Sequence, residues 1–146
     1  MNILLINPSW FVNKRGIWYQ IRSCMPSIGL GYIAAVLEKE NNSVVLIDAE
    51  AEGLDIKGFT NRLNELNLYP DFIGITSTTS IFYNAIELAG ICKSKFPKSK
   101  IIFGGVHSSV LPQESLGYEF VDFVIRGEGE YTMRDLVRGE CLGEIK

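Results

Sequence analysis

The sequence predicts an α/β fold in which a five-stranded parallel sheet lies between two layers of helices. Short apolar runs alternate along the chain with segments of helical periodicity, and strands joined through helices of about ten residues or more pair in parallel. The apolar runs are continuous, as in strands that are covered on both faces. We therefore expect a flavodoxin-like (Rossmann-like) three-layer sandwich with strand order 2-1-3-4-5.

The N-terminal part of the chain supplies two strands and the helix between them. Residues 2–6 are an apolar run closed by Asn7-Pro8, which predicts a buried strand. Residues 29–40 carry apolar side chains at helical spacing, and Ser27 is a candidate N-cap for this helix. The apolar run at 43–48 predicts the second strand.

The middle of the chain repeats this alternation. Helical spacing over 56–66 precedes an apolar run at 71–76, which predicts the third strand. Another helix is expected over 81–96, because apolar residues recur on one face and Pro97 ends the pattern. The run at 100–104 predicts the fourth strand.

The C-terminal part completes the predicted sheet. A short helix opened by Pro112 is expected over 111–118, followed by a fifth strand over 121–125. The last helix is expected over 129–137. The polar, glycine-broken residues 138–146 predict a linker leading out of the domain, or the cut edge of a longer chain.

Length and composition indicate one folded domain, which we assign to residues 1–137. The chain has 146 residues, of which 47% are hydrophobic and 21% charged, with a net charge of -3. These values exclude a disordered chain and argue against a nucleic-acid-binding surface. No apolar run reaches the roughly 18 residues of a membrane span. The short apolar start lacks a basic n-region, so it is not read as a signal peptide.

The three cysteines, Cys24, Cys92 and Cys141, are too widely spaced for a disulfide framework or a C-x-x-C site. Each is expected to be a buried or unreactive thiol. The same spacing excludes an iron–sulfur cluster held by three thiolates of this chain. A reducing, cytoplasmic setting is therefore expected.

Ligands of an open parallel sheet bind at the carboxyl ends of the strands, near the switch in strand order. In the predicted fold four loops lie at these ends, namely 7–10, 76–80, 104–109 and 126–130. No loop carries a cluster of catalytic or metal-ligating type. The site is therefore expected to bind a ligand without supplying a catalytic group.

Two of these loops have the composition of ligand-binding loops. The run 76–80 offers five consecutive hydroxyl groups, whereas capping the next helix needs one. Gly104-Gly105 either lets a ligand approach the backbone or makes a tight turn. Neither loop matches G-x-G-x-x-G or a P-loop, so both interpretations of each loop stay open.

The loops also contain titratable groups. A lone histidine is most often a surface or capping residue, but the place of His107 just after Gly105 favours a functional role. Glu128 and Glu130 either bind a ligand or stabilise a helix start through its dipole.

The segment from Pro8 to Pro26 is long for a strand-to-helix connection and holds both tryptophans, Trp10 and Trp18. We expect it to be a mobile lid over a flat ligand or a partner domain, or else a loop folded on its own core.

Several segments together resemble the N-terminal cobalamin-binding domain of cobalamin-dependent radical S-adenosylmethionine (radical SAM) enzymes. The resemblance covers nearly the whole chain. It rests on residues 3–8, 26–34, 45–48, 72–77, 102–107 and 121–130. The last two segments, about 20 residues apart, are its specific part.

This resemblance implies a base-off cobalamin whose nucleotide tail lies between strands 1 and 3, with the corrin ring across the strand ends. His107 is expected beside the tail, and no protein histidine is expected to ligate the cobalt. The cofactor-binding residues it implies are Asn7, Pro8, Ser9, Trp10, Thr76, Ser77, Thr78, Thr79, Gly104, Gly105, His107, Gly127 and Glu128.

The resemblance also implies a partner domain and an activity. In the family, a downstream domain holds a [4Fe-4S] cluster and S-adenosylmethionine through C-x-x-x-C-x-x-C, and the intact enzymes transfer methyl groups or close rings. This chain lacks that motif and is not expected to be catalytic by itself. It also has Asn7-Pro8-Ser9-Trp10 where other cobalamin proteins have D-x-H-x-x-G, which excludes a histidine ligand from that loop.

Two alternative functions stay open. One is a stand-alone cobalamin-binding or sensor module, and the other is a flavin carrier of flavodoxin type. The flavin carrier fits less well, because Asn7-Pro8-Ser9-Trp10 is a poor phosphate loop. A phosphoacceptor receiver domain is rejected, since Asn7 and Thr76 stand where it needs acidic residues.

Overall fold

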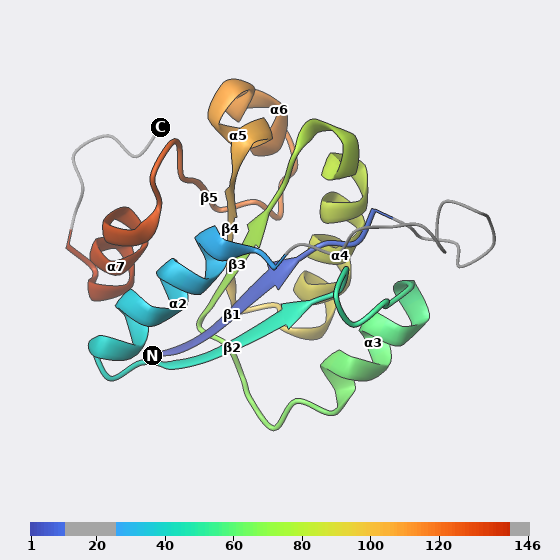
Figure 1. Ribbon diagram of the computed structural model, residues 1–146, viewed down its shortest axis with the longest axis horizontal. Coiled ribbons are helices and arrows are strands. Elements are labelled where there is room, and N and C mark those ends of the chain that lie inside the picture. Colours follow the sequence, from blue (N-terminus) through green and yellow to red (C-terminus); the bar gives the residue numbers. More distant parts are fainter. Residues whose placement is uncertain (11–25, 141–146) are drawn as a thin grey trace.

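The computed structural model describes residues 1–10 and 26–140. Its five strands form one parallel sheet in the order β2-β1-β3-β4-β5, which confirms the predicted topology (Figure 1). The strands are β1 (Asn2–Asn7), β2 (Ser43–Asp48), β3 (Phe72–Thr76), β4 (Lys100–Gly104) and β5 (Phe123–Val124).

Helices cover both faces of this sheet (Figure 1). They are α2 (Ile28–Lys39), α3 (Ile56–Asn64), the 3₁₀ turn η1 (Thr79–Ile81), α4 (Phe82–Lys95), α5 (Val106–Val110), α6 (Pro112–Leu116) and α7 (Glu130–Arg138). Apolar residues of α2 and α7 pack on one face, and those of α3 and α4 pack on the other. The three-layer sandwich is thus confirmed.

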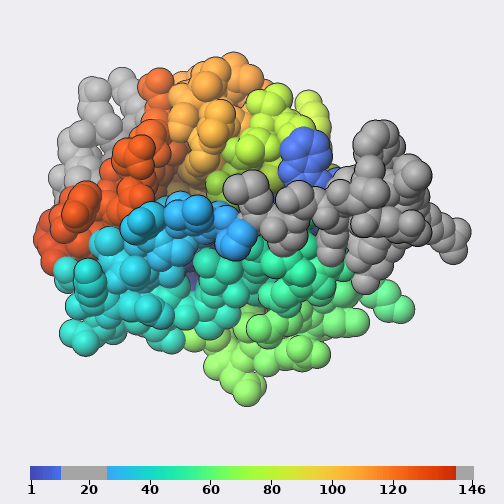
Figure 2. Space-filling model, viewed as in Figure 1, coloured from blue at the N-terminus to red at the C-terminus, as the bar shows by residue number. Residues whose placement is uncertain are grey.

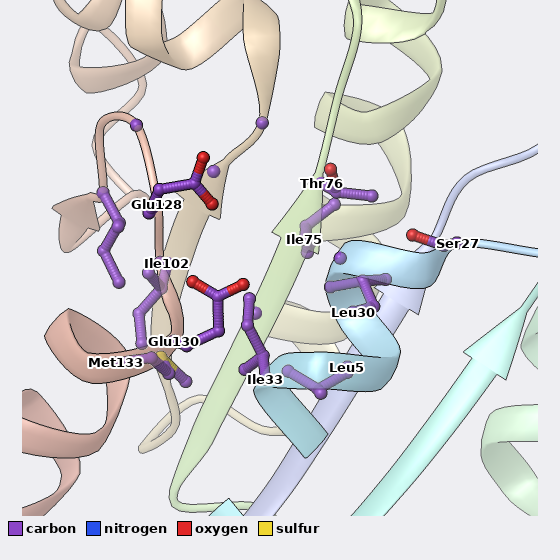
Figure 3. A pocket seen from close by; sticks show the side chains of 17 residues that line it. Leu5, Ser27, Leu30, Ile33, Ile75, Thr76, Ile102, Glu128, Glu130 and Met133 are labelled. Carbon is purple, nitrogen blue, oxygen red and sulfur yellow. The ribbon is translucent and has the colours of Figure 1, made fainter. Parts of the chain in front are cut away.

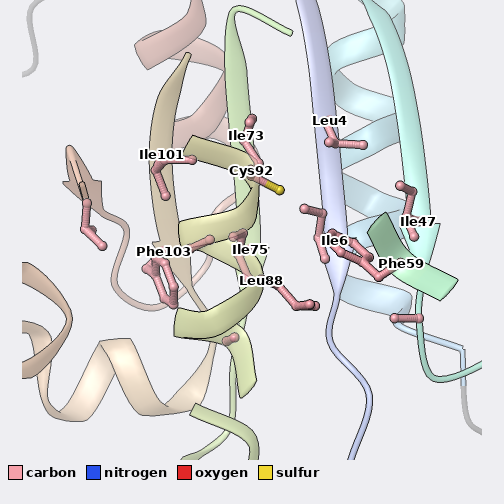
Figure 4. Close-up of a cluster of buried hydrophobic side chains, with 14 of the residues drawn as sticks. Leu4, Ile6, Ile47, Phe59, Ile73, Ile75, Leu88, Cys92, Ile101 and Phe103 are labelled. Atoms are coloured by element: carbon pink, nitrogen blue, oxygen red, sulfur yellow. The ribbon is translucent and has the colours of Figure 1, made fainter. Parts of the chain in front are cut away.

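The core is divided by the sheet into two clusters of unequal size. Successive side chains of a strand point to opposite faces, so Leu4 and Ile6 of β1 enter the cluster under α3 and α4, whereas Ile3 and Leu5 enter the cluster under α2 and α7. Figure 4 shows the larger cluster, on the side of α3 and α4. On the other face α2 and α7 lie side by side, as the space-filling view shows (Figure 2).

Several element boundaries differ from the prediction. Residues 104–109 were expected to be a loop, but Val106–Val110 form α5. This helical turn is favoured by Ser109, whose backbone N–H and hydroxyl both donate to the Gly105 carbonyl. β5 is only two residues long. Asp55, which the sequence analysis missed, caps α3 by accepting from the Gly58 N–H.

Other local expectations have mixed outcomes. Ser27 occupies the N-cap position of α2, but its side chain makes no capping hydrogen bond. Cys92 is fully buried, which confirms a buried thiol there, and burial raises the pKa of this thiol to about 12. Cys24, Cys141 and residues 11–25 of the expected lid lie outside the described residues.

No helix in the described part of the chain is long and apolar enough to cross a membrane.

An acidic side chain joins β4 to the start of β5. Asp122 accepts hydrogen bonds from the Ile101 N–H at 2.9 Å and from the Lys100 ammonium at 2.7 Å, with Lys93 at 3.4 Å. Burial by itself would raise the pKa of Asp122, but these hydrogen bonds and the two lysine charges outweigh burial and lower it. The folded state therefore favours the ionised carboxylate.

We expect Asp122→Asn to lower the free energy of unfolding at pH 7 by about 1 kcal/mol. Because the pKa of Asp122 is lower in the folded state, this stabilisation is fully present above the unfolded-state pKa near pH 4 and is lost as pH falls through the folded-state value. Urea unfolding of both proteins from pH 7 to pH 2 measures the difference. The exposed Glu119 provides the control Glu119→Gln, and an Asp122→Asn difference independent of pH would contradict the expectation.

Candidate cofactor site

A cavity of about 270 Å³ lies on the face of the sheet that α2 and α7 cover. Figure 3 shows Leu5 and Met133 in its depth, and Thr76, Ser27 and Glu128 around the carboxyl ends of the strands. Most of its depth is thus apolar, and Thr76, Ser27 and Glu128 lie toward the strand ends, whereas the Glu130 carboxylate lies deeper. The cavity is lined by residues of β1 and of β3, which are hydrogen-bonded neighbours in the sheet.

The floor of the cavity includes a glycine inside a strand. Leu5, Gly74 and Ile102 are aligned across β1, β3 and β4 and line the cavity. A Cβ atom on Gly74 would lie 2.9 Å from Leu5 Cδ2 and 3.8 Å from Met133 Cε. A glycine inside a strand often marks the close approach of a ligand, but the sequence analysis did not single out Gly74.

Of the two interpretations that the sequence left open for Gly104-Gly105, the structure supports the tight turn. Gly105 has φ +90°, and a Cβ there would lie 2.6 Å from Thr76 Oγ1 and 2.7 Å from the Ser77 carbonyl oxygen. The turn therefore needs glycine at this position. Both glycines also line the cavity, where Gly104 has no close neighbour.

A second cavity of about 320 Å³ adjoins the first at the strand ends. The two share Ser27 and Thr76. The other lining residues are Asn7, Pro8, Trp10, Glu50, Ser77, Thr78 and Ile81. Most of them lie at or just after the ends of β1 and β3, whereas Glu50 follows β2. This cavity is therefore richer in polar side chains than the depth of the first.

The structure brings most of the predicted site residues to these two cavities. Thr76, Gly104, Gly105, Gly127 and Glu128 line the first, whereas Asn7, Pro8, Trp10, Ser77 and Thr78 line the second. Ser9, Thr79 and His107 line neither.

Ser9 instead supports the wall of the second cavity. Its hydroxyl donates to Glu50 Oε2 at 2.9 Å, and the Trp10 N–H donates to the same oxygen at 2.8 Å. Glu50 is only 8% exposed. The first loop is therefore fastened to the segment that follows β2.

His107 is not a surface residue, and the structure does not place it beside the first cavity. It is 2% exposed and its ring stacks on Phe82 at 3.9 Å between centroids. Nδ1 lies 3.4 Å from Thr79 Oγ1, and Nε2 lies 3.5 Å from Glu114 Oε2. The first turn of α5 directs this side chain toward α4, away from the face that carries the cavity.

Several lining residues were not among the predicted site residues, and they include Ser27, Glu50, Gly74 and Glu130. Glu50 follows β2, whose loop the sequence analysis left out although β2 is a neighbour of β1. For Glu130 the sequence left open a ligand contact or a helix start, and Figure 3 shows its carboxylate near Ile102 and Ile33.

Comparison with known proteins assigns the family. Residues 15–137 match the family model described as the B12 binding domain. The chain belongs to the B12-binding domain family. Within this B12-binding domain, both cavities border residues that the match covers.

Its relatives are longer proteins. An uncharacterized methyltransferase of Pyrococcus horikoshii is 33% identical over 138 residues, 94% of this domain and 29% of that protein. The cytidylyl-2-hydroxyethylphosphonate methyltransferase of Streptomyces wedmorensis is 31% identical over 149 residues, 89% of the domain and 27% of that protein. The anaerobic magnesium-protoporphyrin IX monomethyl ester cyclase of Rubrivivax gelatinosus is 27% identical over 139 residues, 94% of the domain and 24% of that protein. The B12-binding domain thus spans less than a third of each relative.

A solved structure shares the fold. It is the radical S-adenosylmethionine methyltransferase TsrM from Kitasatospora setae, determined with tryptophan substrate and a SAM analog. The TM-score is 0.74 at 18% identity, and the match covers 99% of the B12-binding domain and 27% of TsrM.

The turn between β4 and α5 yields a test of the local geometry. Gly105→Ala should lower the free energy of unfolding by about 2 kcal/mol or more, because the φ of +90° is strained for alanine and its Cβ would meet the backbone of Ser77. Gly104→Ala is the matched control, since the nearest atom to its Cβ would be 3.9 Å away. Equal stability of the two variants in urea would contradict this assignment.

Proposed function

We propose that this B12-binding domain holds cobalamin in the base-off form, with the nucleotide tail in the first cavity and the corrin ring across the strand ends. The observation that carries this proposal is the largely apolar cavity beside Leu5, Gly74 and Ile102 in a family that binds B12. The cavity volume of about 270 Å³ is at the lower end for a whole small ligand. It therefore suits one part of a large cofactor.

The chemistry of the first cavity matches a flat heteroaromatic base. Leu5, Ile102 and Met133 offer an apolar depth, where a dimethylbenzimidazole would lose contact with water. Thr76, at the strand end, offers a hydroxyl that can hydrogen-bond a ring nitrogen or a ribose oxygen. Among the described residues the lining includes the carboxylates of Glu128 and Glu130 and no lysine or arginine, so the cavity disfavours an anionic group.

The base-off form follows from where the tail lies. A base buried beside Gly74 cannot also ligate the cobalt above the strand ends. No imidazole replaces it, because the first loop has none and His107 is buried against Phe82. We expect the lower face of the cobalt to carry water or no ligand.

The domain would act together with a larger partner. Its relatives are methyltransferases and cyclases more than three times its length, and they include sequence beyond the part it matches. We propose that a radical SAM domain, with its [4Fe-4S] cluster and S-adenosylmethionine, faces the strand ends, in a reducing cytoplasmic setting. Bound cobalamin would supply a cobalt-held methyl group or a redox centre to that reaction. The residues of this chain bind and orient the cofactor.

Cobinamide has the same corrin ring as cobalamin but no nucleotide tail. Comparing the binding of the two therefore tests whether the tail lies in the first cavity. Gly74→Ala should weaken cobalamin binding about tenfold, because its Cβ enters the cavity floor beside Leu5. Cobinamide binding should be unchanged. Gly90→Ala is the matched control, since its Cβ meets no atom within 4 Å.

Calorimetric titration with hydroxocobalamin and with cobinamide measures both affinities. If Gly74→Ala binds cobalamin as tightly as the wild-type chain does, the tail does not lie above Gly74. If the wild-type chain binds neither corrinoid, the proposed function itself is wrong.

Electron paramagnetic resonance of the chain loaded with cob(II)alamin tests the lower ligand. We expect cobalt lines without nitrogen triplet splitting, both in the wild-type chain and in His107→Ala. Triplets that disappear in His107→Ala would contradict the proposal and make His107 the axial ligand.

A further inference from the structure

The first cavity contains a carboxylate that its apolar surroundings do not explain. Glu130 begins α7, and Figure 3 shows its carboxylate near Ile33 and Ile102, two apolar residues of the cavity lining. Met133, three residues further along α7, lines the same cavity and is 2% exposed. The carboxylate therefore lies among side chains that cannot donate a hydrogen bond to it.

The position of Glu130 along α7 makes this carboxylate an exception. Residues three and seven positions apart share one face of a helix, so Glu130 begins the stripe that continues with Met133 and Val137, both of which are buried. An amphipathic helix fills the stripe that faces the core with apolar residues. Natural proteins break such local rules mainly at functional sites.

The helix dipole accounts for an acidic residue here but not for the direction of its side chain. A carboxylate in the first turn of a helix stabilises the positive end of the dipole. A carboxylate at the next position would do the same in contact with water, because Tyr131 is 66% exposed. The dipole therefore does not explain why the acidic residue is on the side of α7 that faces the cavity.

The described part of the chain does not neutralise Glu130. Among the described residues, no hydrogen bond or ion pair joins its carboxylate to another group. Arg134, one turn further along α7, is paired with Asp135 at 2.6 Å and lies over the Tyr131 ring at 5.0 Å from its centroid. The depth of the cavity thus offers a hydrogen-bond acceptor that a ligand can use.

This acceptor indicates which heteroaromatic base fits best. An ionised carboxylate only accepts hydrogen bonds, so its partner must be a donor. The exocyclic amine of a purine would donate a charge-assisted hydrogen bond to Glu130 away from bulk water. A neutral dimethylbenzimidazole carries methyl groups and a ring nitrogen that only accepts, and it would leave the carboxylate without a partner.

We infer that Glu130 selects the base of the nucleotide tail, so that the first cavity favours a base with an N–H donor over dimethylbenzimidazole. This inference rests on the proposed function, which places the tail in the first cavity. It adds a preference among cofactors that share the corrin ring and differ in the base.

Two cofactors that differ only in the base test this preference. One is cobalamin, and the other is its analogue in which adenine replaces dimethylbenzimidazole. In calorimetric titrations at pH 7 we expect the wild-type chain to bind the adenine form about tenfold more tightly, as for one hydrogen bond to a charged group. Cobinamide, which has no base, is the reference ligand.

Glu130→Leu should reverse the preference. It removes the acceptor, so the adenine form should bind about tenfold more weakly than to the wild-type chain, while cobalamin binds as tightly or more tightly. Glu130→Gln should lie between, because its carbonyl oxygen still accepts but carries no charge. Glu38→Gln is the matched control for the lost charge, since Glu38 is exposed on α2 and lines neither cavity.

The ratio of the two affinities separates selection by Glu130 from damage to the fold, because damage weakens both cofactors alike. An unchanged ratio in Glu130→Leu would overturn the inference, and so would a wild-type chain that prefers cobalamin. A change in cobinamide binding in Glu130→Leu would also overturn it, since Glu130 would then act on the ring and not on the base.

The same titrations separate this inference from the proposed function. If the wild-type chain binds cobalamin and the ratio does not depend on Glu130, cobalamin binding stands and selection of the base by Glu130 is wrong. If the wild-type chain binds none of the three corrinoids, both are wrong.

Discussion

The site depends on a short hydrogen-bonded junction between the ends of β3 and β4. The Ser77 N–H donates to the Gly104 carbonyl, and the His107 N–H donates to the Ser77 carbonyl. Gly105 makes this junction possible, because a side chain there would collide with Thr76 and Ser77 and keep the two backbone segments apart. From this point Gly104 and Gly105 form a wall of the first cavity, while Ser77 and Thr78 form a wall of the second. One turn therefore sets the geometry of both cavities.

The fold was predictable from the sequence because helices cover both faces of the sheet, so the strands are apolar on both sides. Continuous apolar runs identify such strands directly, and the fourth strand has the predicted bounds, Lys100–Gly104. α5 was not predictable in the same way, because Val106–Val110 is too short to show periodicity. Its start is set by the positive φ of Gly105 and by contacts with β3, which depend on tertiary structure.

The candidate site was predictable in position and less so in detail. The rule that ligands bind at strand ends identified the loops after β1, β3, β4 and β5, and residues of all four line a cavity. The rule does not say which way a side chain turns, so it grouped His107 with residues that face the cavities. The rule applies to loops, so it did not identify Gly74, which lies inside a strand and lines the first cavity.

The unequal packing of the two faces has a consequence for how the domain moves. The face under α3 and α4 holds a small pocket of about 20 Å³, whereas the face under α2 and α7 contains the much larger first cavity. Local opening is easiest where fewer apolar contacts hold an element in place. A ligand that fills the cavity becomes part of the hydrophobic core of that face, and its binding free energy stabilises the folded state. The backbone amides of α2 and α7 would then gain protection from hydrogen exchange when the cofactor binds, while those of α3 and α4 would be protected already.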